Sequence, residues 1–185
     1  MTTYYSLQIA QATGSETQSE IANGAAGTFL VSNGTSSAAS YKVPTVASTV
    51  GTSASPSGTT STTYVMLGLG GSWKITPTTY GNVRITINGQ LNNGTTGDGI
   101  NVIMAYGTGT APTNGAALTG TTVGINTIFT DLTGLLTNGV PFSKDYIITG
   151  LTAGTAYWFD LQFKAVTGGT ASVINCQFTA QELMS

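Results

Sequence analysis

Hydrophobic and polar residues alternate with a period of two through much of the second half of the chain. In residues 83–88, valine or isoleucine at every second position alternates with arginine, threonine and asparagine. The same period recurs in residues 100–106, 157–164 and 174–178. This alternation is typical of a strand that buries one face, and the runs are rich in residues enriched in strands. We therefore predict a strand over each run.

Turn signals lie between these runs. Asparagine and glycine tolerate the positive φ angles that tight hairpins need. Many short strands with such punctuation indicate an all-β antiparallel sandwich or jelly roll, and they do not favour βαβ units. The turn dipeptides are Asn-Gly at 88–89, 93–94, 114–115 and 138–139, Asp-Gly at 98–99 and Gly-Gly at 168–169.

The first part of the chain differs in composition and is rich in Ser, Thr, Ala and Gly. We predict an N-terminal arm or small β subdomain over residues 1–62, used for attachment, and a β-sandwich domain over residues 63–185. The stretch 47–62 is interpreted either as a linker or as an extended segment leading into a strand. Within the arm, short strands are predicted at 4–10, 28–32 and 41–46, and one short helix at 16–23.

Charged residues make up only 6% of the chain, whereas a typical soluble domain has about 25%. A surface of hydroxyls, amides and glycine suits resistance to salt and extensive contact with other subunits. The five cationic residues are scattered along the sequence and the formal net charge is −2. Because no basic stripe could neutralise a phosphate backbone, we predict no nucleic-acid partner.

Cys176 is the only cysteine, so an intrachain disulfide is excluded. It alternates with Ile174 and Phe178, which predicts a buried structural thiol. The N-terminal residues lack the basic start and long apolar run of a signal peptide. No apolar stretch approaches the roughly 18–20 residues that span a bilayer, so we predict no membrane association and synthesis in a cytoplasm.

Catalytic chemistry finds little support in the sequence. Histidine is absent, which excludes Ser-His-Asp and Cys-His sites and histidine-ligated metals. The glycine-rich stretches 68–73 and 107–112 lack the Gly-Lys-Ser/Thr of a phosphate loop. We predict that the protein is not an enzyme and uses no cofactor or metal. The remaining acidic candidates are isolated in sequence and are interpreted as turn caps or solvated residues: Asp98, Asp131, Asp145, Asp160 and Glu182.

Two groups of aromatic residues are candidates for contacts with other subunits. Trp158, between Tyr157 and Phe159, alternates with the hydrophobic face of its run. It indicates either a subunit contact on an outer face or a strand that is buried on both sides. In the arm, Tyr4 and Tyr5 are candidates for contact with a partner, or for docking onto the protein's own domain. The candidate set for partner contact is Tyr4, Tyr5 and Leu7, and the set for trimer contact is Tyr157, Trp158 and Phe159.

Between residues 56 and 183 the sequence resembles a recurrent domain of bacteriophages and prophages. The most specific stretch is residues 106–121, YGTGTAPTNGAALTGT. The other matching stretches are PSGTTSTT at 56–63, MLGL at 66–69, ITP at 75–77, GNVRITING at 81–89, GLTAGTAYWFDL at 150–161 and FTAQEL at 178–183.

The order of the last strands, residues 153–161 and 173–183, is also similar to that of the tumour-necrosis-factor/C1q jelly roll, which commonly forms trimers. These resemblances imply a homotrimeric virion protein, synthesised in the cytoplasm of a host bacterium. The leading expectation is a capsid decoration or minor head protein whose N-terminal region binds the major capsid protein or another virion protein. The alternative is a receptor- or glycan-binding protein of a tail fibre or tip.

Overall fold

The computed structural model describes residues 7–8, 20–21, 28–31, 40–42, 46–130 and 138–184. The chain divides into two compact units, residues 1–45 and 46–185. The division lies before the predicted boundary at residue 62, because Ser48–Ala54 forms a strand that pairs with the last strand of the sandwich. Of the two interpretations of residues 47–62, the strand lead-in therefore describes this part of the segment.

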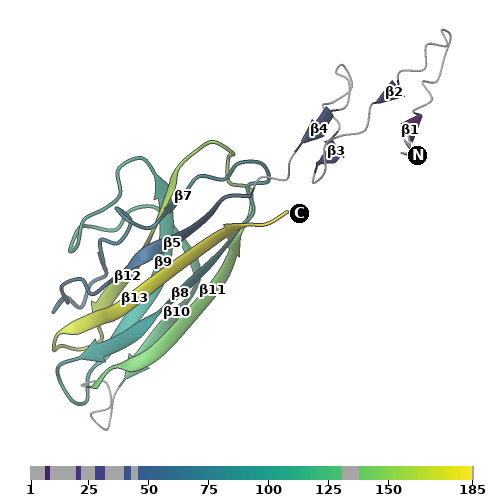
Figure 1. Cartoon of the computed structure of the whole chain (residues 1–185). Helices are drawn as coiled ribbons and strands as arrows, with labels where there is room; N and C mark the ends of the chain where they lie inside the picture. Colours follow the sequence, from purple (N-terminus) through teal and green to yellow (C-terminus); the bar gives the residue numbers. More distant parts are fainter. Residues whose placement is uncertain are drawn as a thin grey trace. The chain divides into compact units, whose positions relative to one another are not determined.

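The described parts of the first unit are two short antiparallel pairs (Figure 1). Strand β2 replaces part of the helix predicted at 16–23, so that prediction was wrong at these two residues. Within the described residues, strands lie at or beside each of the ranges predicted at 4–10, 28–32 and 41–46. The pairs are β1 (Leu7–Gln8) with β2 (Glu20–Ile21), and β3 (Phe29–Val31) with β4 (Ser40–Lys42).

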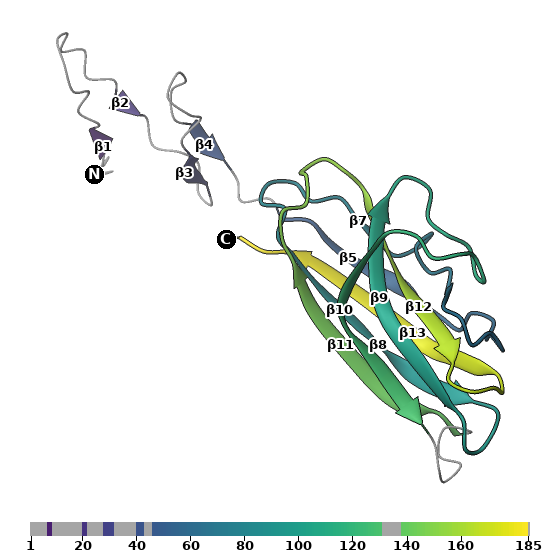
Figure 2. The same ribbon diagram turned by 180° about the vertical axis from the view of Figure 1, so that it is seen from behind.

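The second unit is an all-β sandwich of two antiparallel sheets, as predicted (Figures 1 and 2). Sheet 1 has the order β11-β8-β13-β5, and sheet 2 has the order β10-β9-β12-β6, with β7 also paired to β12. The bounds are β5 Ser48–Ala54, β6 Val65–Met66, β7 Lys74–Ile75, β8 Val83–Asn93, β9 Gly99–Thr108, β10 Thr121–Thr130, β11 Val140–Ile148, β12 Tyr157–Ala165 and β13 Ala171–Glu182.

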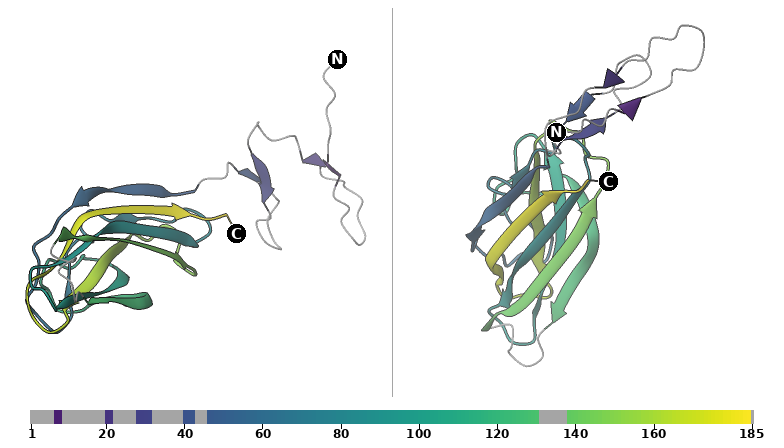
Figure 3. Two further views of the ribbon diagram at one scale, coloured as in Figure 1. Left: turned by 90° about the horizontal axis from the view of Figure 1, so that it is seen from below. Right: turned by 45° about the vertical axis from the view of Figure 1, so that its right-hand side comes forward.

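The period-two pattern correctly predicts which residues of β8 face the core. Ile85 and Ile87 are fully buried, whereas Arg84 and Asn88 on the opposite face are exposed. Successive side chains of a strand point to opposite faces, so each alternate set meets one environment. Alternation therefore places the branched residues of β8 between the two sheets, which lie as two layers in Figure 3.

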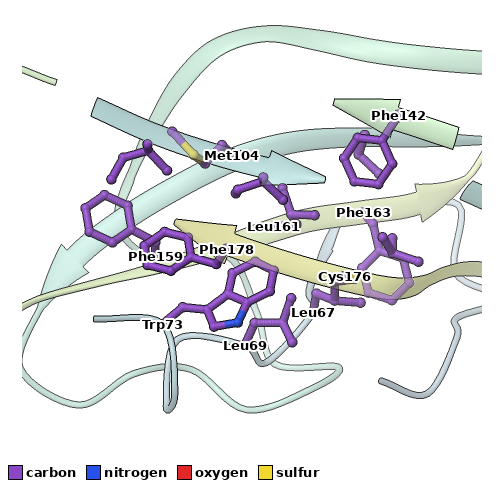
Figure 4. Close-up of a cluster of buried hydrophobic side chains, with 14 of the residues drawn as sticks. Leu67, Leu69, Trp73, Met104, Phe142, Phe159, Leu161, Phe163, Cys176 and Phe178 are labelled. Carbon is purple, nitrogen blue, oxygen red and sulfur yellow. The ribbon is translucent and has the colours of Figure 1, made fainter. Parts of the chain in front are cut away.

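A stack of aromatic rings joins the two layers (Figure 4). The ring of Trp73 lies 5.2 Å from that of Phe178 of β13, at an interplanar angle of 11°. On the other side, the ring of Phe159 of β12 lies 5.5 Å from that of Phe178. All three side chains are fully buried, and offset aromatic stacking adds about 1 kcal/mol per pair to the burial of their area. Phe159 and Phe178 thus connect β12 and β13 across the core.

Candidate interaction surface

The outer face of sheet 2 is covered by the chain itself over β12 and the neighbouring part of β9. Residues 109–120, which join β9 to β10, are held by hydrogen bonds from the Met66 N–H to the Ala116 carbonyl (3.0 Å) and from the Gly115 N–H to the Met66 carbonyl (2.9 Å). Beneath them Met66, Ala105 and Trp158 form a small second cluster, and the exposure of Trp158 is only 2%. We call residues 109–120 the covering loop.

The covering loop fits closely around the indole of Trp158. The indole Nε1 donates a hydrogen bond to the Thr108 carbonyl at 3.1 Å. Gly120 has a φ of 82°, and a Cβ at this position would lie 2.5 Å from the indole Cη2. A residue with a side chain would be strained by this φ and would also overlap the ring. Residues 106–121, the most specific stretch of the sequence resemblance, therefore include the residues that enclose Trp158.

The outer face of sheet 1 carries no such cover among the described residues. Cross-strand register places side chains of four strands in rows, because directly opposite residues point to the same side of a sheet. One row places Ile147, Arg84, Gln181 and Ser48 side by side, and the next contains Asp145, Thr86, Thr179 and Val50. We call this surface the open face: Arg84, Thr86 and Asn88 of β8, Gln177, Thr179 and Gln181 of β13, Ser143, Asp145 and Ile147 of β11, and Ser48 and Val50 of β5.

The open face contains one ion pair, between Arg84 and Asp145. The Arg84 Nε donates to both carboxylate oxygens, at 3.1 Å to Oδ1 and 3.0 Å to Oδ2, and Nη2 also donates to Oδ2. The hydrogen bond from Arg84 lowers the pKa of Asp145, and the same bond raises the pKa of Arg84. The two charges therefore neutralise each other, and the rest of the open face offers amides, hydroxyls and two aliphatic side chains.

Glu182, at the end of β13, is enclosed by donors. Its carboxylate accepts hydrogen bonds from the N–H groups of Ala47 and of four consecutive residues, 78–81, and from the Thr78 hydroxyl. Burial alone would raise the pKa of Glu182, but these donors outweigh it and hold the pKa well below its usual range. Glu182 was predicted to be a turn cap or a solvated residue. It does cap the bend at residues 78–81, but it is a fully buried anion and not a solvated residue, and it fastens the start of the sandwich to its last strand.

Two aspartates bind backbone N–H groups of other loops. Asp98 accepts hydrogen bonds from the N–H groups of Thr167 and Gly168, so it links the β8–β9 and β12–β13 connections. Asp160, on the outer side of β12, accepts from the N–H groups of Gly68 (2.9 Å) and Leu69 (3.0 Å). Burial raises the pKa of Asp160 to about 6 despite these donors, whereas for Asp98 the donors outweigh burial and lower the pKa. Both roles hold loops in place.

The outcomes for the acidic candidates differ. Asp98 is a turn cap as predicted, and the exposed Asp145 lies on a solvated face as predicted. Asp160 also caps loop N–H groups, but it is fully buried and not solvated, because alternation places it on an outer face and cannot show that a loop covers that face. Asp131 lies outside the described residues.

The candidates for trimer contact lie mostly inside the protomer. Phe159 is fully buried in the core, and Trp158 is enclosed by the covering loop, so neither presents a surface to another subunit. Of the two interpretations of Trp158, the strand buried on both sides fits the structure. Tyr157 is half-buried, and its hydroxyl accepts a hydrogen bond from the Thr152 N–H at 3.0 Å. Tyr157 alone of the three keeps an exposed portion.

Of the three candidates for partner contact in the arm, only Leu7 is among the described residues. Tyr4 and Tyr5 lie outside the described residues, and Leu7 is described only as a backbone position of β1. Cys176, by contrast, is buried in the core as predicted, and burial raises the pKa of its thiol to about 12.

No protein-family model matches the sequence, and no curated protein matches it. Within the described ranges, no group of three or more metal-ligating side chains comes together. The same ranges contain no helix long and apolar enough to cross a membrane.

Proposed function

We propose that this chain is a structural protein of a bacteriophage particle, a trimeric capsid decoration or minor head protein that binds the shell through its N-terminal region. The observation that carries the proposal is the division at residue 45 into a separate small unit and a sandwich with a core of its own. This division fits two jobs, attachment and display. A protein that binds assembled subunits and not free ones stabilises the shell by mass action.

The strand order supports the more specific proposal that the sandwich is a jelly roll. If β6 and β7, which both pair with β12, count as one interrupted strand, each sheet has four strands. The first and last strands, β5 and β13, are then neighbours, and the chain crosses repeatedly between the sheets. Eight strands in two sheets built from Greek keys characterise the double-sheet jelly roll. The likeness to the tumour-necrosis-factor/C1q type remains part of the proposal.

Glu182 supports the attachment role. Its carboxylate binds the Ala47 N–H at 3.0 Å, and the Glu182 N–H donates to the Ala47 carbonyl at 2.8 Å. These bonds lie directly after the point where the first unit ends. If the sandwich is displayed on a shell, any mechanical force on it passes through the segment at Ala47. The buried carboxylate of Glu182 links this segment to β13, an inner strand of sheet 1.

Electron microscopy of the intact particle tests the proposal. We expect density for the sandwich on the outside of the head, in a copy number that matches a set of symmetry-related sites on the shell. Density found only in the tail would overturn it. Light scattering of the purified full-length chain tests the trimer, and a mass corresponding to a monomer at micromolar concentration would contradict that part.

The alternative is a receptor- or glycan-binding protein of a tail fibre or tip. The specific observation that favours it is the open face, which leaves hydroxyl and amide side chains accessible on four strands. Binding of the purified protein to host cells, together with density at the tail tip, would support the alternative over the head location.

A further inference from the structure

The open face contains a hollow of about 300 Å³ lined by Arg84, Thr86, Thr179 and Gln181. Register explains its composition, because Arg84 lies directly opposite Gln181 and Thr86 directly opposite Thr179 on the neighbouring strand. Two hydroxyls, one carboxamide and one guanidinium thus converge from only two strands. The volume is at the lower end of ligand-binding pockets, which suits a short stretch of a polar chain and not a large apolar ligand.

The chemistry of the hollow favours an uncharged ligand. Asp145 already neutralises Arg84, so an anion entering the hollow would meet a carboxylate beside the guanidinium. The pair still offers both kinds of group, since a guanidinium has five N–H donors and a carboxylate about four acceptor positions. Each hydroxyl of a sugar both donates and accepts. Neighbouring hydroxyls can therefore bond to Arg84 and Asp145 without disrupting the pair.

Two aliphatic side chains border the hollow. Ile147 lies beside Arg84 in the register of β11 and β8, and Val50 lies beside Thr179 in that of β5 and β13. Their exposures are 59% and 77%, which is high for branched aliphatic residues. A pyranose ring has an apolar C–H surface as well as polar edges. The polar hollow could therefore bind the hydroxyl edges of a pyranose, while the two aliphatic side chains contact its C–H surface.

We propose that the hollow and its borders are a binding site for a neutral oligosaccharide. The open face contains no Trp or Tyr, which are the residues that dominate the binding energy of protein–protein contacts. Its single arginine is already paired, which does not suit nucleic acid or sulfated chains. Because the site is shallow and lacks a stacking ring, we expect a dissociation constant on the order of 1 mM for one protomer. The site does not depend on whether the particle carries the chain on its head or tail.

Nuclear magnetic resonance titration of the full-length chain tests this site. The probes are neutral hexasaccharides of glucose, N-acetylglucosamine, mannose and galactose at about 10 mM, and one sulfated hexasaccharide. We expect at least one neutral probe to shift the backbone amides of residues 84–86, 145–147 and 179–181, and the sulfated probe to shift them less. The site is refuted if none of the four neutral probes shifts these amides, or if the sulfated probe binds as well as the best neutral one.

Substitution separates the hollow from general surface effects. Thr179→Ala should weaken the binding of the best probe at least about fivefold, because a ligand hydroxyl loses its partner. The matched control is Thr122→Ala, an exposed threonine on β10 of the other sheet, which should leave affinity unchanged. Equal affinity of both variants for the probe would overturn the assignment. So would a shift of the same amides with protein concentration in the absence of sugar, since that would indicate a second copy on this face.

Discussion

The two outer faces of the sandwich begin from similar strands and end in opposite environments. On sheet 2 the side chains of Trp158, Asp160 and Gln162 point away from the core, yet each is at most 3% exposed. On sheet 1 the outward Gln177, Thr179 and their neighbours are exposed. The difference lies in the connections, because the covering loop and the segment before β7 fold over sheet 2. Outward polar residues of sheet 2 are therefore part of a packed layer, whereas those of sheet 1 form an accessible surface.

The largest expected effect comes from removing the indole under the covering loop. Trp158→Ala should lower the free energy of unfolding by about 3–5 kcal/mol, because a buried side chain of this size leaves a cavity. Urea denaturation followed by circular dichroism measures it. Trp158→Phe, which keeps a ring, should cost clearly less. A loss below about 1 kcal/mol for the alanine variant would mean that the covering loop is not packed as described.

Two aspartates on opposite outer faces provide a matched comparison of intermediate size. Asp160→Ala should cost about 2–3 kcal/mol at pH 7.5, because the buried N–H groups of Gly68 and Leu69 lose their acceptor. Asp145→Ala removes only an exposed ion pair and should leave the unfolding midpoint unchanged. Both variants can be measured in one set of urea titrations. Equal effects would show that burial does not distinguish these two carboxylates.

The pattern of the sequence accounts for the sandwich better than for its surfaces. Alternation identified the strands around Ile85, Met104, Leu161 and Phe178, because each has one face in the core. Alternation could not show that Trp158 is buried, since whether a loop lies over a strand depends on where that loop is held by hydrogen bonds. Here the loop is held by a backbone hydrogen bond to a strand more than forty residues earlier in the chain, near Met66.

The same limit applies to the candidate site. The outward side chains of β8, Arg84 and Thr86, were identified from alternation. Their neighbours Thr179 and Gln181 could not be, because register between strands distant in sequence depends on three-dimensional pairing. The bulge between Ile174 and Gln177 shifts that register further, and no turn dipeptide marks it. The hollow thus arises from the pairing of β8 with β13 and cannot be predicted from either strand alone.

The pH dependence of stability should carry the signature of Asp160. Burial raises its folded-state pKa to about 6, above the ordinary value of 3.8 in the unfolded chain. A raised pKa means that the folded state binds the proton more tightly, so the contribution is present at low pH and is lost as pH rises through 6. Relative to Asp160→Asn, the wild-type protein should therefore gain about 2 kcal/mol between pH 7.5 and pH 4.5.

The reference variant in this experiment cancels the opposite trends of Glu182 and Asp98, whose lowered pKa values make the protein lose stability at more acidic pH. Asp145→Asn serves as a control, because the lowered pKa of Asp145 keeps it ionised across the range. A flat difference between wild type and Asp160→Asn would show that Asp160 is more accessible to water than the structure indicates.

The smallest expected effect separates two glutamines that occupy equivalent outward positions on the two sheets. Gln177 of β13 is exposed on the open face, so Gln177→Ala should change the free energy of unfolding by less than about 0.5 kcal/mol. Gln162 of β12 is 3% exposed, and Gln162→Ala should cost at least about 1 kcal/mol, because the packing of its buried side chain is lost. Urea titrations of both variants, with midpoints compared at a common slope, measure the difference. If Gln177→Ala were as costly as Gln162→Ala, the face of sheet 1 would have to be covered in solution, either by another copy or by another part of the chain. That outcome would remove the open face as a binding surface, while leaving the packing of sheet 2 as described.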